Sequence, residues 1–443
     1  MTRHEVLRQD AAEIFYAGLR AVDPGDAIQR HVQREGEILH VGSQTYDLDS
    51  FRHIYVVGGG KAGAAMASAI EDLLGARITQ GWVNVKYEHL APTRTVHIHE
   101  AGHPVPDEAG VQGTQEIVRL LEAATARDLV ICVISGGGSA LLPAPVAGIT
   151  LPQKQAVTKL LLNCGATIHE INTIRKHISA VKGGQLARAA SPATVVTLIL
   201  SDVIGDPLDT IASGPTVPDS QTFTDCLDIL KKYDIEAQLP APVLRRLQEG
   251  AQGTVADTPK AGDPIFTNVQ NLIIASNAQA AKAAAEKANA LHYSTMLLST
   301  FVEGETREVA KVHAAILKEI LHSGHPLPAP ACIISGGETT VSIQGDGLGG
   351  RNQEFVLAAA REIDDLHNVV ILSAGTDGTD GPTDAAGAIA DGETVQRARK
   401  QALDPLAFLK NNDSYHFFEA LGDLMKTGPT NTNVMDLRIL LAG

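Results

Sequence analysis

The stretch HIYVVGGGKAGAAM (residues 53–66) joins a short β-branched and aromatic run to three glycines and then to small residues. A short continuous apolar run predicts a buried strand, and glycines directly after it allow a tight turn into a helix. When such units alternate along a chain, they predict parallel strands covered by helices on both faces. We therefore expect a Rossmann-like, doubly wound, mainly parallel α/β sheet with this turn at its carboxyl edge.

The same pattern recurs along the chain, and each apolar run ends at glycines or at a carboxylate. Two copies lie in the first half, at 129–138 (LVICVISGGG) and 194–202 (TVVTLILSD). Two more lie in the second half, at 331–338 (ACIISGGE) and 368–377 (NVVILSAGTD). Residues just beyond the strand ends of such a sheet converge on one crevice, so we expect these glycines and acids to lie together.

Length and a change in composition predict two domains. A chain of 443 residues is too long for one ordinary domain. Residues 236–266 lack the repeated pattern and are rich in proline, glycine and charge, which is typical of a domain boundary. We expect a larger N-terminal Rossmann-like α/β domain at 1–240, a linker at 241–265 and a smaller C-terminal α/β domain at 266–443.

Composition argues against several classes of protein. Apolar residues make up 44% of the chain and charged residues 20%, which is typical of a globular protein. The formal net charge of −15 argues against nucleic acid or an anionic membrane as a partner, because both require a basic face. The cysteines are scattered, and the N-terminus has no apolar signal region. We expect a cytoplasmic monomer or homodimer with reduced thiols and without a membrane or nucleic-acid partner.

The first glycine loop, Gly58-Gly59-Gly60-Lys61-Ala62-Gly63, fits the pattern G-x-G-x-x-G between a strand and a helix. A dinucleotide site would add a ribose-binding acid about 20 residues on. The next strand candidate, 81–87, instead ends at Lys86 and Tyr87. Lys61 at a helix N-terminus adds a positive charge to backbone N–H donors, which suits a phosphate or a carboxylate. A glycine turn with a solvated lysine is the alternative interpretation.

A second glycine loop, Gly136-Gly137-Gly138-Ser139, also follows a strand candidate. Three glycines let backbone amides approach an anion closely, and Ser139 adds a hydroxyl donor. Segment 172–185 carries the densest basic cluster of the chain, with Arg175, Lys176, His177 and Lys182. This cluster is interpreted either as part of an anion site or as a solvated helix face.

Asp202 directly follows the strand candidate at 194–201, with Asp206 and Asp209 nearby. A carboxylate at a strand end serves as a general base or as a Mg²⁺ ligand. Asp206 precedes a proline and is equally typical of a turn. Asp202 is therefore the strongest acidic candidate in the first half.

The histidines His97, His99 and His103 form the pattern H-x-H-x-x-x-H, which has the spacing of a transition-metal chelator. His97 and His99 share one face of the strand candidate. No thiolate or further ligand of recognisable spacing follows, so we reject a zinc site.

The second half carries an arginine in a glycine-rich loop. Glu338 stands at a strand end, and Arg351 and Asn352 follow Gly349-Gly350. An arginine in this position can reach into a cleft, where its fork neutralises charge on a transferring phosphoryl group. We therefore take Arg351 as the leading candidate of this half.

The segment SAGTDGTDGPTDAAG (373–387) spaces Asp377, Asp380 and Asp384 through glycines. A flexible acidic loop suits Mg²⁺, although the spacing does not match an EF-hand. Aspartate and glycine also dominate ordinary turns, so both interpretations stay open.

Several motifs together resemble one family. In chain order they are GGGKAG (58–63), GHPVPDEAG (102–110), ISGGGSALLP (134–143), NTIRKHISAVKGGQLA (172–187), LSDVIGDPLDTIASGPT (200–216), SGGETTV (335–341), GGRNQEFVLA (349–358), GTDGTDGPTDAAGA (375–388) and TGPTNTNVMDL (427–437). On these motifs the chain resembles the two-domain glycerate 2-kinase family, whose smaller C-terminal part is called the MOFRL domain. The resemblance runs nearly end to end.

The resemblance implies ATP-dependent phosphorylation of D-glycerate to 2-phosphoglycerate, with the active site in the cleft between the domains. It also implies functional weight on Lys61, Asp202 and Arg351, which the residue patterns single out as well. We expect ATP and Mg²⁺ as cofactors, with Lys61 and Arg351 balancing charge and Asp202 accepting the proton of the attacking hydroxyl. A role for Asp202 as a metal ligand stays open.

Further residues are expected to bind the cofactors. The expected nucleotide-binding residues are Gly58, Gly59, Gly60, Gly136, Gly137, Gly138, Ser139, Lys182, Glu338, Asn352 and Asp377. The expected metal ligands are Asp377 and Asp380.

Two other functions remain open. An NAD(P)H-dependent hydroxypyruvate reductase, a label formerly given to members of the family that the chain resembles, would use the G-x-G-x-x-G loop. It would lack a ribose acid and would leave Arg351 and the acids at 377–384 without a role. A non-catalytic small-anion or sugar-phosphate-binding module would gain nothing from Asp202, because an acid beside a bound anion lowers affinity.

Overall fold

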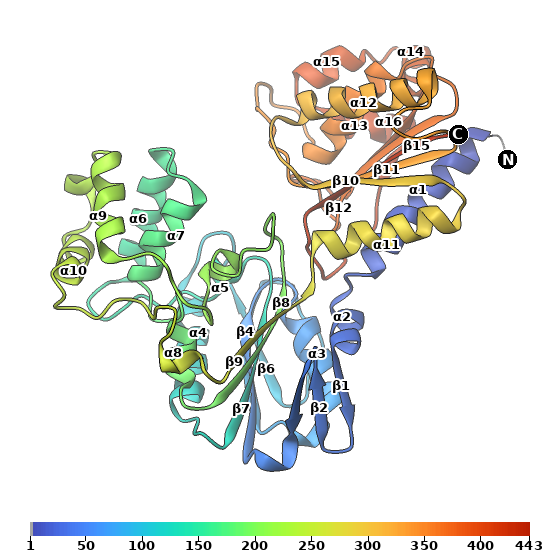
Figure 1. Ribbon diagram of the computed structural model, residues 1–443. Coiled ribbons are helices and arrows are strands. Elements are labelled where there is room, and N and C mark those ends of the chain that lie inside the picture. The colour runs from blue at the N-terminus through green and yellow to red at the C-terminus, as the bar shows by residue number, and fades with distance from the viewer. Residues whose placement is uncertain (1–2) are drawn as a thin grey trace. The chain divides into compact units, whose positions relative to one another are not determined.

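The computed structural model describes residues 3–443 and divides the chain into two compact units (Figure 1). The central unit is Ala27–Ile274. The terminal unit combines the N-terminal segment up to Asp26 with Ala275–Gly443. Each unit is built around a six-stranded sheet.

The sheet of the central unit has the strand order β6-β5-β4-β7-β8-β9. β4 pairs in parallel with β5 on one side and with β7 on the other, and the outer pairs β5–β6 and β7–β8 are also parallel. The chain therefore winds outward from β4 in both directions, and the switch point lies between β4 and β7. The strands are β4 (His53–Gly59), β5 (Gln80–Lys86), β6 (Val96–Ala101), β7 (Asp128–Ile134), β8 (Thr194–Leu200) and β9 (Val269–Ala275). This confirms the predicted doubly wound α/β fold.

The strands of the central unit form because their apolar runs are buried on both faces. All seven residues of β7 are buried, as the unbroken run LVICVI predicts. Helices α3 (Gly63–Leu74) and α4 (Glu108–Glu122) follow β4 and β6 and contact the sheet. Asp107 starts α4 by accepting a hydrogen bond from the Gly110 N–H. A small antiparallel sheet precedes them, made of β1 (Val32–Glu35), β2 (Ile38–Val41) and β3 (Gln44–Asp47).

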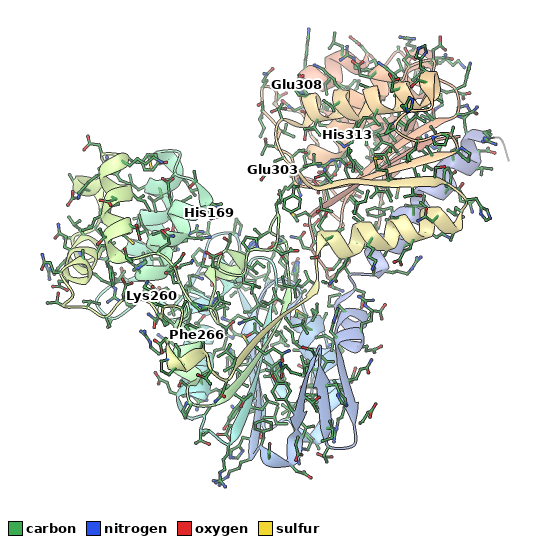
Figure 2. The ribbon with its side chains drawn as sticks, in the orientation of Figure 1. His169, Lys260, Phe266, Glu303, Glu308 and His313 are labelled. Atoms are coloured by element: carbon green, nitrogen blue, oxygen red, sulfur yellow. The ribbon has the colours of Figure 1, made fainter. Side chains whose placement is uncertain are left out.

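Four helices of the central unit share a separate hydrophobic core (Figure 1). They are α6 (Leu151–Asn163), α7 (Ile168–His177), α9 (Phe223–Lys232) and α10 (Ala241–Ala251). Capping boxes that begin at Thr150, Thr167 and Thr222 fix the first turns of α6, α7 and α9. Figure 2 shows His169 at the start of α7 and Phe266 beside the short helix α8 (Gln185–Ala190).

The two compact units of the structure differ from the domain boundaries expected from the sequence. Residues 241–265, expected as a linker, include α10, whose Val243 and Leu247 are fully buried in the helical core. The proline and glycine content of this segment therefore comes from turns within the central unit. At the N-terminus, helix α1 (Arg3–Arg20) packs in the terminal unit, because its apolar face, including Ile14 and Phe15, is buried there.

The sheet of the terminal unit has the order β10-β11-β15-β12-β13-β14. β15 (Asp436–Ala442) runs antiparallel to both of its neighbours, β11 (Ala331–Gly337) and β12 (Val369–Gly375). The expectation of a parallel sheet in this half is therefore wrong: the last strand inserts between two strands that point the same way. The other strands are β10 (Ser294–Val302), β13 (Gly387–Asp391) and β14 (Leu424–Met425). The carboxyl ends of β11 and β12 still meet at one edge, on either side of Asp436.

Helices cover both faces of this sheet (Figure 1). α1 and α11 (Asn277–Ala290) pack together on one face, and α12 (Thr306–Ser323) and α13 (Arg351–Glu362) pack together on the other. His313 of α12 is buried against Phe355 and lies 2.9 Å from the Ser335 hydroxyl (Figure 2). Burial lowers the pKa of His313 to about 4, so it serves as a neutral core residue. The remaining helices are α14 (Thr394–Lys400), α15 (Pro405–Lys410) and α16 (Ser414–Leu421).

Across residues 3–443, no helix combines the length and the apolar character that crossing a lipid bilayer requires.

Candidate active site

The two glycine loops of the central unit are bonded to each other at the switch point of the sheet. The Lys61 N–H donates to the Gly136 carbonyl oxygen at 2.8 Å, and the Ala62 N–H donates to the Ser135 hydroxyl at 3.0 Å. Both loops lie directly after the neighbouring strands β4 and β7. Ligands of open α/β sheets bind at this kind of position.

Gly136 and Gly137 bring the expected catalytic residues of this unit together. A Cβ atom on Gly136 would overlap Oδ2 of Asp202. A Cβ on Gly137, which has a φ of +82°, would lie 2.9 Å from Nε2 of His103 and 3.5 Å from Cγ of Lys61. Lys61, Asp202 and His103 therefore surround one dipeptide, and only glycine leaves room for them there.

His103 lies in this group as an uncharged side chain. Burial, reinforced by the positive charges of Lys61 and Lys86, lowers the pKa of His103 to about 4. A neutral imidazole offers one hydrogen-bond donor and one acceptor next to the glycine loops. The sequence pattern indicates His103 only as a candidate zinc ligand and does not predict its place beside the glycine loops.

Ser139 of the second glycine loop belongs to a buried hydroxyl network. Its Oγ shares a hydrogen bond of 2.8 Å with the Ser213 hydroxyl, which donates to Oδ1 of Asn172 at 3.1 Å. Ala212 and Ser213 have positive φ angles of 50° and 63°, which non-glycine residues rarely adopt. Such strain persists where the surroundings hold it, often at functional sites.

A cavity of about 590 Å³ lies next to this loop. Its lining includes His103, Gly137 and Ser139 together with Lys154, Arg175 and Lys182.

Two of the three lysines that line the cavity, Lys154 and Lys182, are deeply buried. Lys154 is 4% exposed and Lys182 is 1% exposed. The Nζ atom of each has no hydrogen-bond partner among residues 3–443.

The positive charges in the cavity also shift one another. Burial, and then the charge of Arg175, lowers the pKa of Lys154 to about 7. Burial, and then the charges of Lys154 and Arg175, hold the pKa of Lys182 well below its usual range. Burial lowers the pKa of Arg175 too. The cavity is a concentration of unneutralised basic groups in an acidic chain, which suits an anion.

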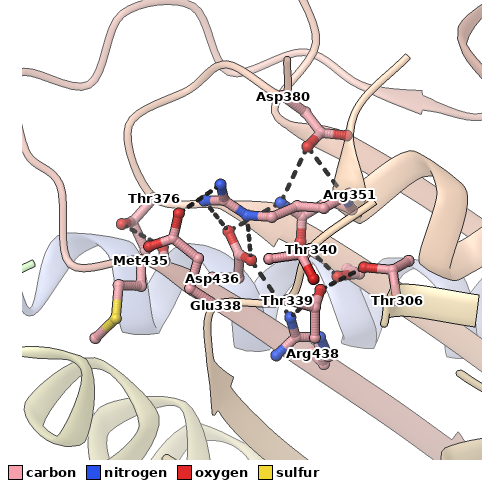
Figure 3. A network of polar contacts seen from close by, with 12 residues as sticks. Thr306, Glu338, Thr339, Thr340, Arg351, Thr376, Asp380, Met435, Asp436 and Arg438 are labelled. Atoms are coloured by element: carbon pink, nitrogen blue, oxygen red, sulfur yellow. Dashed lines mark hydrogen bonds and ion pairs between the residues drawn. The ribbon is translucent and has the colours of Figure 1, made fainter. Parts of the chain in front are cut away.

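The terminal unit holds Arg351 in a network of carboxylates (Figure 3). Arg351 is the first residue of α13, and its guanidinium donates to both oxygens of Asp436 at 2.7 and 2.9 Å. It also pairs with Glu338 at 2.7 Å. Burial acts to lower the pKa of Arg351, but Asp436 and Glu338 outweigh burial, so the pKa is raised above its ordinary value. The guanidinium is held at one place and stays charged.

Asp380, from a separate loop, caps the N-terminus of helix α13. Its two carboxylate oxygens accept the N–H groups of Asn352 at 3.0 Å and of Gln353 at 2.8 Å. Burial raises the pKa of Asp380 to about 7, partly offset by these hydrogen bonds. The Asn352 amide bridges Asp380 and Asp436, at 3.3 and 2.9 Å. A Cβ on Gly375 would lie 3.4 Å from Oδ1 of Asp377 and 3.6 Å from the Asn352 amide nitrogen, so Asp377 also lies in this region.

The fit of a Mg²⁺ ion to these acids can be tested from their partners. No group of three or more His, Cys, Asp or Glu residues that could hold a metal is present within 3–443. Both oxygens of Asp380 are engaged by N–H donors, so Asp380 does not fit a metal ligand without loss of the cap. Mg²⁺ in nucleotide sites is held by one or two carboxylates plus substrate phosphates, and Asp202 or Asp377 fits that smaller requirement.

The structure thus gathers the predicted residues into two groups. The central unit brings together both glycine loops, Lys61 and Asp202, with Lys182 on the adjoining cavity. The terminal unit brings together Glu338, Arg351, Asn352, Asp377 and Asp380. The sequence reading assigned no role to Asp436, Arg438 or Lys154. Arg438 is fully buried, donates to Asp436 at 3.3 Å and to Thr339 at 3.1 Å, and supports the network from beneath (Figure 3).

Family models match most of the chain and define its class. The model described as "Domain of unknown function (DUF4147)" matches residues 10–248, and the model of the MOFRL family matches residues 331–436. The chain is therefore a two-unit α/β protein that combines these two families.

Relatives of known name identify the family more closely. A glycerate 2-kinase from Pyrococcus horikoshii is 41% identical over 98% of this chain and 97% of its own length. A D-glycerate 2-kinase from Thermotoga maritima is 41% identical over 98% of both chains. The crystal structure of glycerate kinase from Thermotoga maritima matches 99% of this chain and 100% of its own with a TM-score of 0.89 at 40% identity. The chain belongs to the glycerate 2-kinase family with a C-terminal MOFRL domain.

Proposed function

We propose that the protein transfers the γ-phosphoryl group of ATP to the 2-hydroxyl of D-glycerate, giving 2-phosphoglycerate and ADP. The observation that carries the proposal is the arrangement at the switch point, where two interlocked glycine loops surround Lys61 and Asp202 beside a cavity of unneutralised cations. Phosphoryl transfer requires mainly positioning and charge neutralisation, which these groups supply. Relatives named as glycerate 2-kinases along nearly the whole chain support the same reaction.

Each residue has a distinct role in the proposal. Lys61 places a positive charge at the N-terminus of α3, where it balances charge on the phosphoryl group. Asp202 accepts the proton of the attacking hydroxyl. Arg351, held by Asp436 and Glu338, is the third group assigned to charge balance in the proposal. Asp202 or Asp377 would supply the carboxylate ligand of a Mg²⁺ ion bound with ATP, and the ion would contribute positive charge at the phosphates.

The alternative of an NAD(P)H-dependent hydroxypyruvate reductase has less support. The ribose of a dinucleotide would be held by an acid at the end of the strand next to β4. That strand is β5, and it ends at Lys86. The fixed Arg351 would also have no part in hydride transfer.

A paired assay tests the proposal. One mixture contains D-glycerate, ATP and Mg²⁺, with ADP release followed; the other contains hydroxypyruvate and NADH, with absorbance followed. We expect ADP only when glycerate, ATP and the divalent metal are all present. Phosphorus NMR of the product should show 2-phosphoglycerate. NADH consumption without ADP release would refute the kinase reaction, and a product that is mainly the 3-isomer would refute the proposed regiochemistry.

A further inference from the structure

The buried lysines of the cavity beside the second glycine loop have no assigned function beyond a general affinity for anions. Lys154 is the fourth residue of α6, where nothing in the sequence distinguishes it from a surface lysine. Its side chain is nevertheless buried, and its Nζ, like that of Lys182, has no partner among residues 3–443. Two buried amino groups without hydrogen-bond partners are costly in a folded protein unless a ligand completes them.

We infer that this cavity binds the polyphosphate chain of a nucleoside triphosphate, with Lys154 and Lys182 as its buried cationic ligands and Arg175 as the third positive group. The inference rests on the proposed phosphoryl transfer and assigns the donor substrate to a specific place. None of the residues that line the cavity is acidic. The positive groups can therefore act on a ligand rather than on a protein carboxylate.

The size and lining of the cavity favour a nucleotide over the acceptor acid. A volume of about 590 Å³ falls in the range of cavities that hold ligands of nucleotide size, about 300–1,000 Å³. A single carboxylate does not require two lysines and an arginine, whereas a triphosphate carries several negative charges. Val105 and Leu162, exposed by 64% and 60%, also line the cavity and offer apolar surface to a base. The same cavity is lined by Gly137, and a Cβ on Gly137 would lie 3.5 Å from Cγ of Lys61.

Proton uptake gives the inference a direct signature. Burial lowers the pKa of Lys154 to about 7, so much of this group is neutral above pH 8 in the free protein. A bound phosphate favours the charged form, so binding should take up a proton. The other charged or titratable groups that line the cavity are His103, Lys159, Arg175 and Lys182. His103 has a pKa lowered to about 4, Arg175 stays charged and Lys159 is exposed, which leaves the two buried lysines as the source of the effect.

The experiment is titration calorimetry of the full chain with ATP, tripolyphosphate, adenosine and D-glycerate at pH 8.5, in two buffers of different ionisation enthalpy. Lys154→Met and Lys182→Met are compared with Lys159→Met, which removes the same charge from an exposed position on the same cavity. We expect each buried-lysine variant to weaken ATP and tripolyphosphate about tenfold or more and to reduce proton uptake. Adenosine should be unaffected, and Lys159→Met should change ATP affinity by less than about threefold.

Far-UV circular dichroism establishes that each variant is folded, and if Lys182→Met does not fold, Lys154→Met alone decides the result. Loss of D-glycerate binding with unchanged ATP binding would overturn the inference and assign the cavity to the acid. Equal ATP affinity in all variants would also overturn it, even if the protein phosphorylates glycerate. Lysine-dependent ATP binding without glycerate phosphorylation would support the cavity assignment and refute the proposed function alone.

Discussion

Lys176 and Lys182 lie six residues apart and are almost equally buried, at 3% and 1% exposure, yet their surroundings differ completely. Lys176 donates to Oδ1 of Asp219 at 3.1 Å and lies 3.5 Å from Asp209. Lys182 has no partner within residues 3–443 and lines a cavity without a carboxylate. A buried lysine with an acidic partner stabilises the fold, whereas one without a protein partner can act on a ligand.

The two lysines also differ in the segments that they hold together. Asp219 also accepts a hydrogen bond from the Thr258 hydroxyl at 3.0 Å, so the Lys176–Asp219 pair ties α7 to the segment around Thr258. Lys260 of that segment pairs with Asp257 at 3.2 Å, and Figure 2 shows it near α8. These bonds close a network inside the central unit. The Lys182 side chain enters no such network, so its loss should cost binding and not folding.

The largest expected effect is on stability. Lys176→Met leaves Asp219 charged, fully buried and without its cation, which should cost about 3–5 kcal/mol. Lys182→Met replaces an unpaired buried cation with an apolar side chain, so stability should stay equal or increase. The measurement is urea unfolding followed by fluorescence of Trp82, the single tryptophan, which lies in β5 of the central unit. Equal losses of stability in the two variants would contradict the assignment of Lys176 to the fold and of Lys182 to ligand binding.

Asp202 and Asp219 allow the same comparison among carboxylates. Asp202→Asn should lower kcat about a hundredfold or more, equivalent to about 3 kcal/mol, and leave ATP affinity nearly intact, because a base acts in the transition state. Asp219→Asn should lower stability and leave kcat of the folded protein nearly unchanged. Lys61→Ala should both raise KM and lower kcat, because bound reactants also feel its charge.

The measurement is a pair of steady-state titrations for each variant, with D-glycerate varied at saturating ATP and then the reverse. If Asp202→Asn retains turnover and loses affinity for ATP or Mg²⁺, Asp202 is a metal ligand. The base would then be sought among Glu338, Asp377 and Asp380.

The residues that local sequence predicts are those that sit in short, continuous patterns. The glycine loops, Lys61 and Asp202 directly follow apolar runs, so their place at the carboxyl edge of the sheet follows from the chain alone. Arg351 was found in the same way, after two glycines at the start of a helix.

The residues that the sequence could not reveal depend on contacts between distant segments. Lys154 becomes a cavity lysine only because α6 packs against α7, and its local sequence is that of an ordinary helix. Asp436 acquires its place because β15 inserts between β11 and β12, which no local pattern predicts. His103 lies in the segment GHPVPDEAG (102–110), but its approach to Gly137 depends on tertiary structure alone.

A smaller effect, on kcat, is expected for a substitution of Asp436. Unlike Lys182, Asp436 is a buried charged residue with a protein partner, and that partner is the proposed catalytic residue Arg351. Asp436→Asn removes one of the charged bonds that fix Arg351, so kcat should fall about tenfold. Because Asp436 acts through Arg351, the same substitution in an Arg351→Ala background should cause little further loss. The measurement is kcat for the wild type, both single variants and the double variant. Additive losses would show that Asp436 supports the fold and does not position Arg351.

The smallest effect concerns Asp380, a buried acid that is stabilised by backbone N–H groups and not by a paired cation. Burial raises the pKa of Asp380 to about 7, so the folded state holds this proton more tightly than the unfolded chain, in which an aspartate has a pKa of about 3.9. The stability that Asp380 contributes is therefore present below about pH 4 and is lost as the pH rises through about 7. Asp380→Asn removes this pH dependence, but its amide nitrogen cannot accept the Gln353 N–H, which should cost about 1 kcal/mol at pH 5. By pH 8.5 the wild type should have lost more stability than this, so the variant should be at least as stable, as measured by urea unfolding followed by far-UV circular dichroism. Asp384→Asn is the matched control in the same loop, because Lys426 lowers the pKa of that exposed acid and the sign reverses, with the difference shrinking as the pH falls. A gap for Asp380→Asn that widens with pH would mean that the carboxylate is charged when folded, held by the N–H groups of Asn352 and Gln353 against the cost of burial.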